Sequence, residues 1–334
     1  MSALAQRGAK RLRISLPSHI GWICRDCRRT FTCTNPALQQ PHSSSSQNAK
    51  QDEKTTHFGF ETVAESLKAS RVADVFSSVA SSYDTMNDLM SLGIHRLWKD
   101  HFVRSLKPGI PPSTISSHQP FEGQKILDIA GGTGDIAFRL LDYATHINRD
   151  TKTSVVVSDI NPDMLAEGKK RFASSPYKMT GRVSFLEANA ENLDSIESNT
   201  IDLYTVAFGI RNFTHKSAAI REAFRVLKPG GVFACLEFTP QLRNPVLNAL
   251  YKRWSFDVIP LIGQVVAADR DSYQYLVESI ERFPTQEEFA NMIKQAGFLI
   301  PGETPEDVQS GKLQSGWEDL SMGIAAIHKG VKPI

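Results

Sequence analysis

From residue 125 onward, short runs rich in β-branched residues alternate with runs of helical spacing, and few folds accommodate such a pattern. The alternation predicts an α/β fold with a doubly wound, mostly parallel sheet that is covered by helices. The 41% of apolar residues in the 334-residue chain suffice for a core of that size. The expected strands are Lys125–Ala130, Ser154–Ile160, Arg182–Glu187, Ile201–Phe208, Gly231–Phe238 and Gly323–His328, and the expected helices are Asp135–Asp142, Pro162–Phe172, Lys216–Leu227 and Thr285–Gln295.

Two stretches outside that alternation define the other expected parts of the chain. Residues 51–108 show helical spacing at Val72–Tyr83 and at His95–Leu106, which predicts an N-terminal helical cap. A loop with several prolines follows, and residues 109–334 are expected to form the sheet domain. Within this domain, residues 244–283 interrupt the alternation and predict an insertion.

The first fifty residues are strongly basic, with eight Lys or Arg against the single acid Asp26. The segment Arg7–Leu16 places cations and apolar residues on opposite faces of a helix, which is typical of a mitochondrial transit peptide. Ser43–Ser46 then indicates a disordered spacer. We therefore expect residues 1–50 to direct the protein to the mitochondrion, with a basic disordered tail as the alternative. The remainder of the chain is mildly acidic, so nucleic acid is not an expected partner.

Neither a membrane span nor a metal centre is expected from the sequence. No run reaches the roughly 18 apolar residues that crossing a bilayer requires. Cys24 and Cys27 have a C-x-x-C spacing, but no second pair completes a set of four zinc ligands. Cys235 lies among apolar residues of a predicted strand and is interpreted as a small core residue.

A glycine-rich turn follows the first predicted strand, where Asp-Ile-Ala-Gly-Gly-Thr-Gly-Asp runs from Asp128 to Asp135 and opens a helix. The turn lies at the carboxyl edge of the sheet, where open α/β folds bind ligands, and Gly132 and Gly134 leave room for one. Its spacing also satisfies a loose dinucleotide fingerprint and fits a merely structural turn. Asp128 favours S-adenosylmethionine, because a carboxylate repels a pyrophosphate but attracts a sulfonium or an ammonium.

Polar residues after the next strands are expected at the same edge of the sheet. Asp159 ends the second strand, and its carboxylate can accept both ribose hydroxyls of an adenosyl group. Asn189 and Ala190 follow the third strand, where a turn can contact adenine, although Asn189 also fits an ordinary turn. Arg211 follows the fourth strand beside the expected crevice, with a solvated arginine as the alternative interpretation.

Two stretches carry a resemblance to a known family. Tyr-Asp-x-Met-Asn at residues 83–87 is followed by Met-Ser-Leu-Gly-Ile-His-Arg-Leu-Trp-Lys at residues 90–99. Arg-Val-Leu-Lys-Pro-Gly-Gly at residues 225–231 is followed by Leu-Glu-Phe-Thr at residues 236–239. Both resemble the signatures of the ubiquinone/menaquinone-biosynthesis C-methyltransferases. The resemblance implies a class I S-adenosylmethionine-dependent methyltransferase fold, and it implies that the cofactor contacts Thr133, Asp159, Asn189 and Ala190.

The resemblance also implies a reaction. A methyl group would pass from S-adenosylmethionine to a ring carbon of a methoxy-benzoquinol with a polyprenyl tail, a step of ubiquinone biosynthesis that needs no metal. A quinol carbon attacks well only while a neighbouring hydroxyl loses its proton. Arg211 is expected to stabilise the resulting phenolate, and Tyr83 and His215 are candidates for relaying the proton.

Partners and location follow from the same resemblance. Besides the polyprenyl quinol, we expect the matrix side of the mitochondrial inner membrane as a peripheral docking surface, other subunits of a ubiquinone-biosynthesis complex, and a second copy of this chain. Residues 244–283 are expected to shelter the tail, with an ordinary core or a subunit interface as the alternative. Two other functions stay open, namely a methyltransferase-like assembly subunit of such a complex and a dinucleotide-binding oxidoreductase.

Overall fold

The computed structural model describes residues 54–79, 87–88, 91, 93–109, 123–267, 269–302 and 316–334. The predicted transit peptide and the proton-relay candidate Tyr83 lie outside the described residues, as do Cys24 and Cys27. The boundaries predicted for the helical cap, the sheet domain and its insertion stay predictions.

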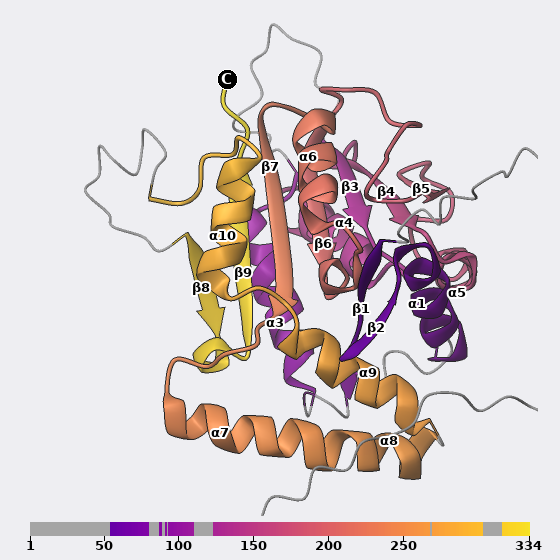
Figure 1. Cartoon of the computed structure of the whole chain (residues 1–334). Helices are drawn as coiled ribbons and strands as arrows, with labels where there is room; N and C mark the ends of the chain where they lie inside the picture. Colours follow the sequence, from indigo (N-terminus) through magenta and orange to yellow (C-terminus); the bar gives the residue numbers. More distant parts are fainter. Residues whose placement is uncertain are drawn as a thin grey trace, which may run out of the picture. The chain divides into compact units, whose positions relative to one another are not determined.

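A seven-stranded sheet lies at the centre of the described part (Figure 1), and its strand order is β5-β4-β3-β6-β7-β9-β8. The strands β3 to β7 run parallel to one another, whereas β9 runs antiparallel to both of its neighbours. This confirms the doubly wound, mostly parallel sheet that the sequence predicts. The strands are β3 (Lys125–Ile129), β4 (Ser154–Asp159), β5 (Val183–Glu187), β6 (Ile201–Ala207), β7 (Leu227–Phe238), β8 (Trp317–Leu320) and β9 (Ala325–Val331).

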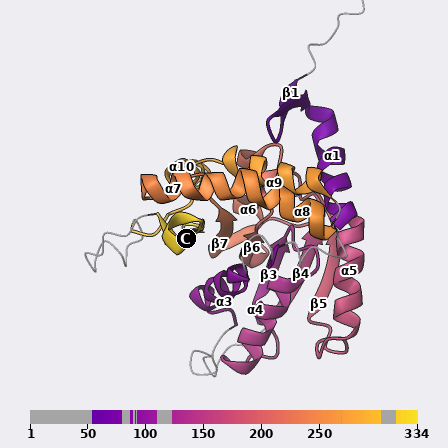
Figure 2. The same ribbon diagram turned by 90° about the horizontal axis from the view of Figure 1, so that it is seen from below.

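Helices cover both faces of the sheet, because neighbouring residues of each strand point to opposite sides. In β3, Ile126 belongs to the apolar cluster under α3 (Ile94–Leu106), α4 (Asp135–His146) and α5 (Pro162–Ala173). The next residue, Leu127, belongs to the cluster under α6 (Lys216–Val226) and α10 (Gln286–Gln295). Figure 2 shows these two helical layers on either side of the strands.

The order of the strands reverses around β3, which pairs with β4 on one side and β6 on the other. Connections from these two strands therefore leave in opposite directions, and a crevice opens at their carboxyl ends. The helix α5 begins at that edge, where the side chain of Asn161 accepts hydrogen bonds from the backbone N–H groups of Asp163 and Met164. This cap and Pro162 at the first helical position fix where β4 ends and α5 starts.

Three parts of the fold were not expected from the sequence. The strands β1 (Thr55–Phe58) and β2 (Glu61–Ala64) form an antiparallel hairpin ahead of α1 (Glu65–Val79), and β8 adds an edge to the sheet. Between β7 and α10, the chain forms α7 (Pro245–Arg253), a π-helical turn at Trp254–Val258, α8 (Ile259–Ala267) and α9 (Arg270–Glu281). In Figure 1, α7 and α8 continue end to end. No described helix is both long and apolar enough to span a bilayer.

Candidate active site

A cavity of about 480 Å³ opens at the carboxyl edge of the sheet. Its walls are the turns that follow four strands, namely the glycine turn after β3, the start of α5 after β4, and the loops after β5 and β6. The helix α1 covers the cavity with Glu65, Ala69, Val72 and Phe76. The cavity therefore lies at the topological switch point of the sheet, where the sequence predicts a ligand site.

The glycine turn after β3 is tight and has little spare room. Ala130, Gly132 and Gly134 all have positive φ angles, of 51°, 46° and 80°. A Cβ atom on Gly132 would lie 2.8 Å from Cε of Met164, and one on Gly131 would lie 2.9 Å from Oδ2 of Asp128. Because larger side chains would fill this space, the turn keeps backbone open to the cavity and close to Asp128.

Asp128 is a buried carboxyl group with one free oxygen. It is 1% exposed, and its Oδ1 accepts a hydrogen bond of 2.7 Å from Oγ1 of Thr205. Its Oδ2 is buried and has no partner among the described residues. Burial raises the pKa of Asp128 to about 7. A buried carboxylate with an unfilled acceptor beside a cavity is suited to a cationic ligand group.

Asp159 is placed by its own turn at the end of β4. Its Oδ2 accepts from the backbone N–H of Gly132 at 3.0 Å, and its Oδ1 accepts from that of Asn161 at 2.9 Å. Burial raises the pKa of Asp159 to about 6, although these backbone hydrogen bonds oppose the rise. The carboxylate thus joins the glycine turn to the start of α5 and still lines the cavity.

The structure brings most of the predicted cofactor residues to one place. Gly134 differs from the others because it precedes α4 as its cap and is not among the lining residues. In the loop after β5, Oδ1 of Asn189 accepts from the backbone N–H of Glu191 at 2.9 Å, which makes a local turn. Contact of these residues with a cofactor stays a prediction. The predicted residues that line the cavity are Asp128, Gly132, Thr133, Asp159, Asn189 and Ala190.

Arg211 lies in a buried network behind the cavity wall. Its Nη1 is 2.9 Å from Oε1 of Glu237, its Nε is 3.3 Å from Oγ of Ser279, and Nη1 also donates to the carbonyl of Phe208. Arg211 is not among the residues that line the cavity, whereas its neighbour Asn212 is. Its predicted catalytic role stays a prediction. The sequence signal that was missed is Glu237, an acid within the buried, otherwise apolar residues 233–238.

His215 lies at the mouth of the cavity, where its side chain is 51% exposed. Its Nδ1 is 2.8 Å from a carboxylate oxygen of Glu191, and its Nε2 is 2.9 Å from one of Glu65. The imidazole therefore bridges the loop after β5 and the start of α1. The structure places this candidate where a proton can pass between the cavity and solvent, and the relay itself stays a prediction.

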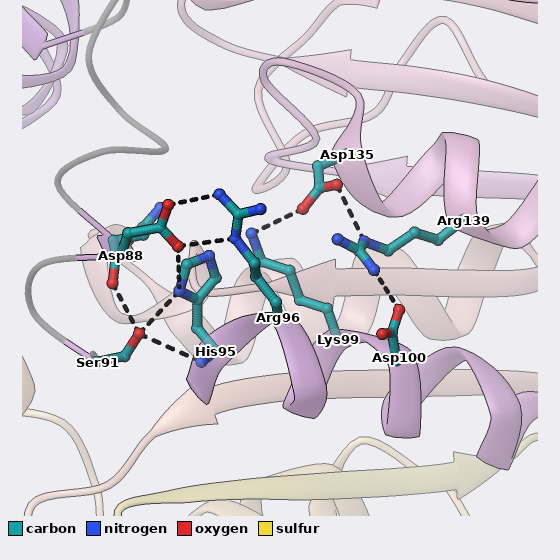
Figure 3. Close-up of polar contacts among 9 residues, drawn as sticks. Asp88, Ser91, His95, Arg96, Lys99, Asp100, Asp135 and Arg139 are labelled. Carbon is teal, nitrogen blue, oxygen red and sulfur yellow. Dashed lines mark hydrogen bonds and ion pairs between the residues drawn. The ribbon is translucent and has the colours of Figure 1, made fainter. Parts of the chain in front are cut away.

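A second group of charged residues lies between α3 and α4 beside the cavity (Figure 3), and sequence reasoning missed its role. Lys99 and Asp135 both line the cavity, with Nζ of Lys99 2.8 Å from Oδ2 of Asp135. Nε of Arg139 contacts the other oxygen of Asp135 at 3.0 Å. Burial alone would raise the pKa of Asp135, but these two cations hold it below the ordinary value. Asp135 is therefore a fixed carboxylate between two cations.

Comparisons with known sequences agree on one family of methyltransferases. The model of the ubiE/COQ5 methyltransferase family matches residues 64–332. The chain is 54% identical over 290 residues to the mitochondrial 2-methoxy-6-polyprenyl-1,4-benzoquinol methylase of Schizosaccharomyces pombe, covering 87% of this chain and 88% of that relative. It is 49% identical over 278 residues to the ubiquinone/menaquinone biosynthesis C-methyltransferase UbiE of Cereibacter sphaeroides, covering 83% of this chain and 97% of that relative.

A solved structure shows the same fold at low identity. The crystal structure of the [4+2]-cyclase SpnF matches with a TM-score of 0.50 and 16% identity, over 79% of this chain and 95% of that chain. Because that protein is named a cyclase, the likeness speaks for the fold and not for a reaction. The fold class expected from the sequence is confirmed by the sheet and the family match together. The chain belongs to the ubiE/COQ5 methyltransferase family.

Proposed function

We propose that the protein transfers a methyl group from S-adenosylmethionine to a ring carbon of 2-methoxy-6-polyprenyl-1,4-benzoquinol in ubiquinone biosynthesis. The observation that carries this proposal is the 54% identity to a relative with that activity in its name, over 87% of the chain. The chemistry of the cavity agrees with it, because buried carboxylates line a cavity at the switch point of the sheet.

The cavity residues fit the proposed cofactor, which supplies a methyl group on a positively charged sulfur. The free oxygen of Asp128 attracts a cation, and the carboxylate of Asp159 accepts ribose hydroxyls. The backbone of the glycine turn, with Thr133, holds the amino-acid end, and the loop at Asn189 and Ala190 contacts the adenine. No cluster of metal ligands occurs among the described residues, and the proposal assigns no metal.

The remaining residues act on the quinol. His215 relays the hydroxyl proton. Because Glu65 and Glu191 face its two ring nitrogens, one nitrogen must turn from its carboxylate to the quinol hydroxyl before it accepts the proton, and the other carboxylate then stabilises the charge. Tyr83 is a second candidate for this relay. Arg211 lies behind the wall, so it acts through the turn that it holds and through ordered water rather than by contact. Loss of the hydroxyl proton makes the neighbouring ring carbon nucleophilic.

We further propose that the protein works on the matrix side of the mitochondrial inner membrane as a peripheral protein. The names of its eukaryotic relatives include the word mitochondrial, and a polyprenyl quinol is too apolar to leave a membrane readily. One face of the segment formed by α7, the π-helical turn and α8 supports contact with the membrane, with a second copy of the chain or with other subunits of a biosynthetic complex. Its exposed apolar residues are Val246, Leu250, Trp254, Leu261 and Val265.

The test is transfer of a labelled methyl group to a short-tailed methoxy-benzoquinol, followed by location of the label. Label on a ring carbon supports the proposal, whereas label on oxygen contradicts it. Cofactor binding with no transfer to any quinol would favour the assembly-subunit interpretation.

Substitutions at Asp159 test the cofactor site itself. Asp163, an exposed residue in the first turn of α5, gives them the matched control Asp163→Ala.

A further inference from the structure

Among the described residues that line the cavity, Lys99 is the only lysine or arginine. It comes from α3 and not from the sheet, and its side chain is 5% exposed. Its ammonium group has three N–H donors, and the described residues offer it one acceptor, the Oδ2 of Asp135 at 2.8 Å. The ammonium therefore has donors left for an oxygen atom within the cavity.

The position of this ammonium is fixed from several sides (Figure 3). Asp135 holds it, and Arg139, which pairs with Asp100, holds Asp135. His95 lies one turn earlier on α3, and burial together with the charge of Lys99 lowers its pKa to about 4. The imidazole is thus neutral at pH 7, so Lys99 is the positive charge that this part of α3 presents to the cavity.

The cavity wall thus holds a free acceptor and a free donor of opposite charge. In the part of the chain that the structure describes, Oδ2 of Asp128 has no partner and Lys99 has N–H donors without an acceptor. Asp135 links them, because it contacts Lys99 and its charge also acts on Asp128. An amino-acid group carries an ammonium and a carboxylate on one carbon atom, and it complements such a pair.

We propose that Lys99 binds the α-carboxylate of the cofactor's methionine group while Asp128 binds its α-ammonium. This inference rests on the proposed function and names a residue that selects the zwitterionic end of the cofactor. The first helical turn of α4 lies beside the same site and adds a favourable dipole for the carboxylate. Arg211 cannot take this role by contact, since Glu237 and the protein backbone occupy its guanidinium.

The test compares S-adenosylmethionine with decarboxylated S-adenosylmethionine, which keeps the sulfonium and an ammonium but lacks the carboxylate. Calorimetric titration gives both dissociation constants for the parent protein, for Lys99→Met and for the control Arg104→Met, which alters an exposed cation of the same helix α3. We expect the parent to bind the complete cofactor about tenfold or more tightly, and Lys99→Met to lose most of that preference. Arg104→Met should keep it.

The outcomes separate this inference from the proposed function. A parent that binds both compounds equally, or a Lys99→Met protein that keeps the preference, overturns the role of Lys99. An equal loss for both compounds also overturns it and indicates structural damage. If Lys99→Met does not fold, the parent's preference and that of Lys99→Arg decide. S-adenosylhomocysteine, which carries the carboxylate without the sulfonium, should bind Lys99→Met more weakly than it binds the parent. The proposed function fails separately, if the parent binds no cofactor or methylates no quinol.

Discussion

Two buried acids near the ends of strands in the same sheet show how a carboxylate that can bind a ligand differs from one that stabilises the fold. Asp128 in β3 and Glu237 in β7 are each 1% exposed. Among the described residues, Oδ2 of Asp128 has no partner, whereas the two oxygens of Glu237 accept hydrogen bonds from the backbone N–H and from the guanidinium of Arg211. Burial of a charged group therefore does not by itself mark a ligand site. The unfilled hydrogen-bonding capacity beside a cavity does.

The largest expected effect comes from breaking the buried ion pair of Arg211 and Glu237. Arg211→Met removes the guanidinium from the buried carboxylate of Glu237, to which only the backbone N–H groups of residue 211 and Phe238 then donate. The free energy of unfolding should fall by about 3 kcal/mol. Denaturant unfolding measures this loss, and the double variant with Glu237→Gln should recover much of it. In the folded fraction, turnover should fall far more than cofactor affinity. A loss of stability below about 1 kcal/mol would contradict the supporting role.

A smaller effect is expected on the ligand side of the comparison. Asp159→Ala should weaken cofactor binding by about 1–3 kcal/mol, because ribose hydroxyls lose a charged acceptor. The fold should persist, since the lost hydrogen bonds involve only a turn at the surface of the cavity. Calorimetric titration beside the Asp163→Ala control measures the change. Unchanged affinity, or tighter binding of NADH by the parent, would refute the cofactor assignment.

The pH dependence of cofactor affinity sharpens the same comparison. In the free protein the pKa of Asp128 is about 7 and that of Asp159 is about 6, both raised by burial. A cationic ligand needs the ionised carboxylate, so affinity should rise with pH through 7 and level off above it. Below these pKa values it should fall by up to about tenfold per pH unit for each proton taken up. Asp128→Asn should remove the upper step, and an affinity that is flat between pH 6 and 8 would contradict the account.

Local patterns in the sequence explain why the fold could be predicted and parts of the site could not. Strand alternation, the glycine turn and helix spacing act over a few residues. They predict the observed first residues of β3, α4 and β4, and the predicted ends differ by one, four and one residues. The partners of Arg211 and Lys99 are 26 and 36 residues away along the chain, and only the assembled sheet brings them together. The hairpin β1–β2 was missed because its two short strands depend on packing against α1 and α9.

The smallest expected effect concerns the apolar helices outside the sheet. The sequence grouped Ile259 and Leu261 as one tail shelter, but Ile259 is 5% exposed and Leu261 is 60% exposed. Leu261→Ser should change the free energy of unfolding by no more than about 0.5 kcal/mol. It should raise the Michaelis constant for a long-tailed quinol and spare a tail-less one. Ile259→Ser, which alters a buried residue, serves as the contrast. Equal effects of Leu261→Ser on both quinols would mean that the tail binds elsewhere.

The most direct test of the comparison is the isosteric pair Asp128→Asn and Glu237→Gln, with cofactor affinity and unfolding measured for both at pH 8. Because burial raises the pKa of Asp128 from 3.8 to about 7, the cofactor-free fold loses stability as the pH rises between these two values, and the loss is complete at pH 8. Asp128→Asn should therefore be at least as stable as the parent at pH 8. That variant should lose cofactor affinity. Glu237→Gln should lose stability and keep affinity in its folded fraction. If both variants lose stability and affinity alike, the distinction between a free and a satisfied buried acid does not hold.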